Sequence, residues 1–170
     1  MKHLKKLISF AIIFAGITAA TFAQVSATAT ATATIVGPIG ITNTANMNFG
    51  NVAVSNVAGT VVMTPAGVRS FTGGCTLPAT TGTVAAGAFN VTGAAAYTYA
   101  ITLPAAATTI TSGAFNMTVD TWTSTPSGTG TLSAGGSQAL TVGGTLHVGA
   151  SQAAGTYVSG TPFTVTVNYN

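Results

Sequence analysis

The sequence contains very few charged residues. Only 3% of its 170 residues are charged, where soluble domains usually carry about a quarter. Three of the four bases are lysines within the first six positions, and the remainder holds one base, Arg69, and one acid, Asp120. Nucleic-acid binding needs several Lys or Arg side chains against phosphates, so the composition excludes a nucleic-acid partner.

Groups that carry catalysis or bind metals are equally scarce. Beyond the basic start there is one histidine, His147, one cysteine, Cys75, one acid and no glutamate. A metal site needs a cluster of such ligands, and a serine-nucleophile mechanism would rest on His147 and Asp120 alone. We therefore predict no enzyme activity, no catalytic residue, no metal and no cofactor. Cys75 lies among small residues and is expected to be a buried, inert thiol.

The start of the chain has the pattern of a secretory signal peptide. Residues 1–6 are basic, 7–17 are mostly apolar and 18–23 are small and neutral. The apolar stretch is shorter than the roughly 20 residues of a transmembrane helix. We expect cleavage after Ala23 or after Ala27, export by the general secretory pathway, and a secreted or cell-surface protein without a membrane span.

The rest of the chain, residues 24–170, is predicted to be a single all-β domain. Valine, isoleucine, threonine and aromatic residues recur with a period of two between Gly, Pro, Asn and Ser clusters, which is typical of strands and turns. Short strands at this spacing favour an antiparallel two-sheet sandwich, immunoglobulin-like or pilin-like. The predicted strands are 25–36, 47–54, 60–63, 68–71, 89–91, 97–103, 115–123, 130–132, 139–148 and 163–169.

The first and last predicted strands are candidates for pairing with another sheet. The first has no lysine, glutamate or internal proline to protect its edge, so it could add to a neighbouring sheet through main-chain hydrogen bonds. Pairing within its own sheet is the alternative. The candidate donor residues are Val25, Ala27, Ala29, Ala31, Ala33 and Ile35. The candidate acceptor edge is the apolar face of the last strand, Phe163, Val165, Val167 and Tyr169.

A second hypothesis is carbohydrate binding by aromatic side chains. By strand parity Asp120 and Trp122 share a face, and a tryptophan beside a carboxylate can stack against a sugar; Tyr97 and Tyr99 would complete the platform. His147 is expected on the exposed, threonine-bearing face of its strand. The spacing of Arg69 and Asp120 leaves open whether they pair.

Several separated motifs occur in order along the chain: Ala29–Ile39, Met47–Val52, Tyr97–Pro104, Gly130–Gly143, Ala154–Tyr157 and Val165–Tyr169. Together they resemble a secreted bacterial family, domain of unknown function 4402. The resemblance implies a β-sandwich and brings no catalytic residue. The Gly155–Tyr157 turn and the alternating last strand are more loosely similar to chaperone–usher fimbrial subunits and spore-coat-type domains.

These features predict an exported, non-catalytic structural subunit of the cell surface or extracellular matrix. A fimbrial subunit is one specific form of this hypothesis. We expect it to associate with itself or with other surface subunits by strand addition, and the looser resemblance adds a periplasmic chaperone as a partner. The alternative function is a carbohydrate-binding sandwich module.

Overall fold

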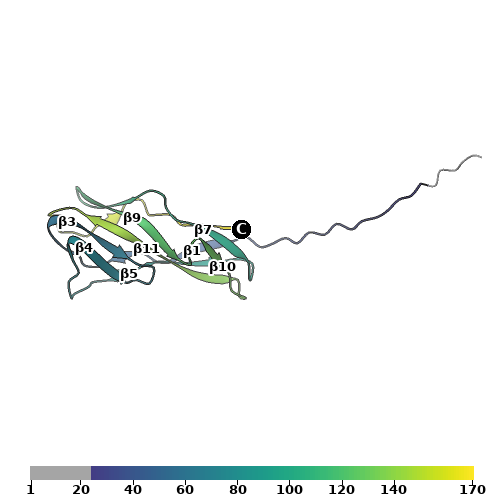
Figure 1. Cartoon of the computed structure of the whole chain (residues 1–170), viewed down its shortest axis with the longest axis horizontal. Helices are drawn as coiled ribbons and strands as arrows, with labels where there is room; N and C mark the ends of the chain where they lie inside the picture. The colour runs from purple at the N-terminus through teal and green to yellow at the C-terminus, as the bar shows by residue number, and fades with distance from the viewer. Residues whose placement is uncertain (1–23) are drawn as a thin grey trace, which may run out of the picture. The chain divides into compact units, whose positions relative to one another are not determined.

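The computed structural model describes residues 24–170, and the predicted signal peptide lies outside the described residues. Regular secondary structure in this part of the chain consists of strands, and all their pairings are antiparallel (Figure 1). This confirms the predicted all-β, antiparallel sandwich. Residues 35–170 form one compact unit, and 24–34 belong to a separate part of the chain.

The strands follow one another with short connections and belong to three sheets. Their bounds are β1 (Gly40–Ala45), β2 (Asn48–Phe49), β3 (Ala53–Met63), β4 (Arg69–Thr76), β5 (Val84–Ala85), β6 (Gly87–Thr92), β7 (Thr98–Thr102), β8 (Thr108–Ser112), β9 (Phe115–Thr125), β10 (Thr129–Thr131), β11 (Ser137–Val148), β12 (Val158–Ser159) and β13 (Thr166–Tyr169). The large sheet has the order β1-β6-β11-β9-β8-β12, with β3 paired to β11 and β4 paired to β3. The small sheets are β10-β7-β13 and β2-β5.

The central strand β11 changes its neighbour halfway along. Its residues 137–142 pair with β6, whereas 144–148 pair with β3, and β9 lies along the other edge. Gly143 stands at this change, where a Cβ would collide with the carbonyl oxygen of Met63. Glycine is therefore needed here because the backbone of β3 approaches β11 too closely for a side chain.

This change of neighbour divides the sandwich into two halves. In the closed half, the large sheet packs against β10-β7-β13 around a fully enclosed core: Val91, Tyr99, Leu132, Leu140, Val142, Val165 and Val167. In the open half, the buried residues are Val61, Cys75, Val119, Leu146 and Val148. Their neighbours Phe49, Val52, Ile110 and Met117 are only partly buried. In Figure 1, β3, β4 and β5 lie toward one end of the domain, and β7 and β10 toward the other.

Two predicted strands differ from the structure. Residues 24–39 contain no strand, because alternating methyl groups provide little apolar area to bury against a sheet. Within 47–54 only the short β2 and the start of β3 form, since Asn48 Oδ1 accepts a hydrogen bond from the Gly50 amide (2.8 Å) and the chain turns there with a φ of 65° at Gly50. The prediction also missed β1, β5, β8 and β12.

Candidate functional site

The N-terminal segment, residues 24–35, is an exposed stretch of alternating small residues. All of its side chains are exposed, and Val25 and Ile35 each retain 92% of their accessible surface. The six predicted donor residues all belong to this segment. Its backbone is in no strand, so its main-chain N–H and C=O groups remain available to a partner.

Gly37, two residues after this segment, is attached to the C-terminal strand. The hydroxyl of Tyr169 in β13 donates to the carbonyl oxygen of Gly37 (3.1 Å) and accepts from the amide of Ala94 (2.7 Å). Ile39 packs against the core of the closed half. These contacts place the beginning of the folded domain beside the C-terminal end of β13.

The predicted acceptor edge can offer a partner strand its main-chain N–H and C=O groups, but not its apolar side chains. Strand β13 pairs only with β7 and forms an edge of its three-stranded sheet. However, Val165 and Val167 are buried in the closed core, and Phe163 and Tyr169 are half-buried. The domain's own core thus covers the apolar face of the predicted acceptor edge, and an added strand would pair with its main chain.

The three candidate sugar-stacking residues do not form one platform. Tyr99 is completely buried, and its hydroxyl donates to Gln138 Oε1 (2.8 Å), so it cannot contact a ligand. Burial also raises the pKa of the Tyr99 hydroxyl. Tyr97 is exposed and packs edge-on against Tyr169, whereas Trp122 packs against Phe163 with ring centroids 4.5 Å apart.

A β-bulge explains why Trp122 faces the interior. Thr121 has a φ of 50°, and the register of β9 against β11 shifts at this point. The extra residue reverses the alternation, so Asp120 faces outward while Trp122 joins Val119 on the inner face. The opposite residue is Gly144, where a Cβ would lie 3.1 Å from the Trp122 ring. Strand parity therefore placed Trp122 on the wrong face.

The outer face of the open half carries the ion pair of this region. His147 Nε2 lies 2.7 Å from Asp120 Oδ1, and both side chains are exposed, as expected for His147. The hydrogen bond from His147, followed by that from Thr121, lowers the pKa of the Asp120 carboxyl below its ordinary value. Arg69 does not pair with Asp120, because it donates to the carbonyl oxygens of Phe49 and Asn51.

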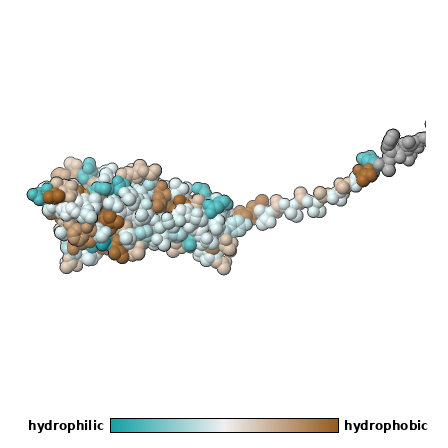
Figure 2. Space-filling model, viewed as in Figure 1, coloured by the Kyte–Doolittle hydropathy of each residue, from teal (hydrophilic) through white to brown (hydrophobic). Residues whose placement is uncertain are grey.

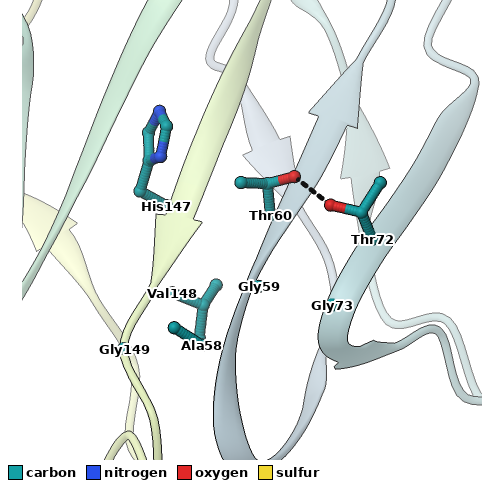
Figure 3. A pocket seen from close by; sticks show the side chains of 8 residues that line it. All are labelled: Ala58, Gly59, Thr60, Thr72, Gly73, His147, Val148 and Gly149. Atoms are coloured by element: carbon teal, nitrogen blue, oxygen red, sulfur yellow. Dashed lines mark hydrogen bonds between the residues drawn. The ribbon is translucent and has the colours of Figure 1, made fainter.

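A shallow hollow lies beside His147 on β3, β4 and β11 (Figure 3). Its polar contents are the His147 ring and the hydroxyls of Thr60 and Thr72, which are 2.7 Å apart and hydrogen-bonded to each other. Within residues 24–170, no three His, Cys, Asp or Glu side chains gather as a metal site requires. Cys75 is buried, as predicted, and burial raises the pKa of its thiol.

A groove of about 1130 Å³ lies in the open half, and we call it the apolar groove. Its floor is the inner face of β8, β9 and β11, and its walls are residues 46–54 and 152–163. Trp122 and Phe163 both line it. No sequence pattern predicted this groove, because its lining comes from segments far apart in the chain and the bulge at Thr121 turns Trp122 toward it.

The surface is otherwise weakly polar. Figure 2 shows mostly pale atoms, with the apolar patches of this view gathered mainly toward the end that carries β3, β4 and β5. None of residues 24–170 forms a helix long and apolar enough to span a membrane.

Comparison with known proteins identifies a family and no individual relative. A family model described as a domain of unknown function (DUF4402) matches residues 39–169. No curated protein and no solved structure matches the chain significantly. The matched region starts at Ile39, so the N-terminal segment lies outside the family domain, although Ala29–Ile39 was among the motifs that suggested the resemblance.

Proposed function

The chain belongs to the DUF4402 family, and we propose that it is an exported, non-catalytic structural subunit of the cell surface or extracellular matrix, with a fimbrial subunit as one form. It associates with other copies of itself, or with other surface subunits, by adding its N-terminal segment as a strand to a neighbouring sheet. The observation that carries this proposal is the N-terminal segment: alternating, uncharged, exposed and in no strand.

The energetics favour burial of this segment. Val25 and Ile35 are exposed apolar side chains, and enclosing each one is worth about 1.5–3 kcal/mol. The alanine methyl groups between them contribute less, so main-chain hydrogen bonds to the acceptor strand must supply much of the affinity. The mature chain has almost no charge to keep copies apart.

The attachment of Gly37 to Tyr169 supports addition to another copy rather than to the same chain. If the segment ran along β13 of its own chain, it would end at Tyr169 and therefore run parallel to β13. Every pairing described in this domain is antiparallel, and antiparallel ladders are slightly more stable per residue. An antiparallel strand on the outer edge of β13 must therefore come from a second copy.

Sedimentation analysis of two matched variants tests the proposal. The double substitution Ala29→Pro and Thr30→Pro removes one N–H donor from each edge of the added strand, because successive N–H groups point to opposite edges. The matched control, Ala29→Ser and Thr30→Ser, keeps both donors. We expect the parent chain and the serine variant to form oligomers as concentration rises, and the proline variant to remain a monomer. If all three are monomers at high concentration, strand addition between copies does not occur.

A further inference from the structure

We propose that the apolar groove is a binding site for an uncharged small molecule with a long aliphatic body, such as a fatty alcohol or ester. This inference does not depend on the proposed function, since it concerns the open half of the domain and not the N-terminal segment. The groove has a volume of about 1130 Å³, slightly above the roughly 300–1000 Å³ of typical small-molecule sites, so it has room for a long ligand.

The lining determines the chemical class of the ligand. No Asp, Glu, Lys, Arg or His side chain borders the groove, so a charged ligand would lose its hydration without gaining a counter-charge. The floor and walls present large apolar side chains instead. The principal ones are Phe49, Ile110, Met117, Trp122, Val148 and Phe163.

Two of the polar side chains that line the groove, Gln152 and Tyr157, are hydrogen-bonded to the protein itself. Gln152 Nε2 donates to the carbonyl oxygen of Asn116 (3.1 Å) and to the hydroxyl of Tyr157 (2.8 Å). That hydroxyl donates to the carbonyl oxygen of Ala153 (2.8 Å). Within residues 24–170, no buried side-chain nitrogen or oxygen lacks a hydrogen-bond partner. The floor strands β8, β9 and β11 present mainly apolar side chains to a ligand, which favours an aliphatic body over a polyhydroxylated one such as a sugar.

The same observations argue against the N-terminal segment of another copy as the occupant. A peptide strand brings N–H and C=O groups that need partners when buried, and the mainly apolar floor of the groove offers few. The segment also presents methyl groups every second residue, which are small against a floor of phenylalanine, methionine and tryptophan. A flexible alkyl chain avoids both problems, because it fills apolar volume and brings no N–H or C=O groups that need partners.

Partial exposure of the lining shows what a ligand would cover. Ile110 and Met117 remain half-buried, and Val54 at the groove retains 40% of its surface. In the closed half, Val91, Leu140 and Val142 of the same sheet have no accessible surface. The aliphatic body of a ligand would complete in the open half the burial that the three-stranded sheet provides in the closed half.

Trp122 provides a direct readout because it is the chain's single tryptophan and lines the groove. Titrating the purified chain with dodecanol should change the Trp122 emission and saturate. Dodecanoate at neutral pH, which has the same chain length but carries a charge, should bind about tenfold more weakly or worse.

Two valine substitutions form the matched test of location. Val54→Arg places a charge at the groove, whereas Val68→Arg places the same charge at an exposed valine (62%) outside it. We expect Val54→Arg to weaken dodecanol binding by about tenfold, and Val68→Arg to change it by less than about twofold. Both positions are substantially exposed, so both variants should fold.

Three results would overturn the inference. The first is an emission that does not respond saturably to dodecanol, and the second is an equal loss in the two arginine variants. The third is an emission that, without dodecanol, changes with protein concentration and loses this change when residues 24–35 are deleted. That last result would assign the groove to the N-terminal segment of a second copy, whereas monomeric behaviour in sedimentation alone would contradict only the proposed function.

Discussion

The closed and open halves of the sandwich bury the same kind of sheet face in different ways. In the closed half, a second sheet covers the face, and Leu140 and Val142 have no accessible surface. In the open half, the loops around β2 and before β13 cover the face incompletely and leave the apolar groove. The difference shows that the apolar face of β11 is buried in both halves, whereas its neighbours β9 and β8 keep partly exposed side chains, Met117 and Ile110, in the open half.

The largest expected difference between the halves concerns their aliphatic side chains. Leu140→Ala removes a fully buried side chain from the closed core and should lower the free energy of unfolding by about 3 kcal/mol, because it leaves a cavity. Ile110→Ala shortens a half-buried side chain beside the groove, where water can fill the space, and should cost about 1 kcal/mol. Urea unfolding of both variants measures the comparison. Equal losses would mean that the open half is as tightly closed in solution as its counterpart.

A smaller effect is expected at two tyrosine hydroxyls. Tyr99→Phe removes the buried hydrogen bond to Gln138 and should cost about 1 kcal/mol, because no water can replace it. Tyr157→Phe, at the groove, removes bonds to Gln152 and Ala153 that water can take over, and should cost less than about 0.5 kcal/mol. Urea unfolding of the two variants measures these losses in stability. A larger loss for Tyr157→Phe than for Tyr99→Phe would contradict the assignment of the two halves.

The smallest effect concerns the exposed pair of His147 and Asp120 on the outer face of the open half. Since the pKa of Asp120 is lowered in the folded chain, its ionised form stabilises the fold above the ordinary carboxyl pKa of 3.8, and this contribution is lost as the pH falls through the folded value. Asp120→Asn should therefore be slightly less stable than the parent near neutral pH and equal to it in strong acid. Unfolding midpoints measured from pH 7 down to pH 2 check this sign. Asp120 is the only acidic side chain of the sequence, so the difference in stability between the parent chain and Asp120→Asn reports the titration of this one carboxyl group.

The sequence predicted the fold class well because strand alternation is a local property. Runs such as 139–148 and 115–123 were placed close to β11 and β9, and the family resemblance was confirmed over residues 39–169. It predicted the faces of these strands less well. A single bulge residue, Thr121, reversed the parity of β9 beyond that point and moved Trp122 from the expected outer face to the groove.

The N-terminal segment shows the opposite kind of error. Its alternation is the most regular in the chain, yet the structure contains no strand there. Alternation makes a strand only when a partner strand is available and one face can be buried, and alanine methyl groups provide little area for that burial. We propose that the segment forms a strand only when it pairs with a partner, and the sedimentation experiment tests this.

By itself, the sequence determined that this protein is an all-β chain with very few charged residues and almost no reactive groups, because composition and period are readable residue by residue. The tertiary structure alone decided where β11 changes its neighbour, which half of the sandwich is closed, and that Trp122 faces a groove. These features depend on backbone approaches between distant segments, such as Gly143 against Met63 and Gly144 against Trp122. No local pattern records such approaches, because each is a property of two strands and not of one.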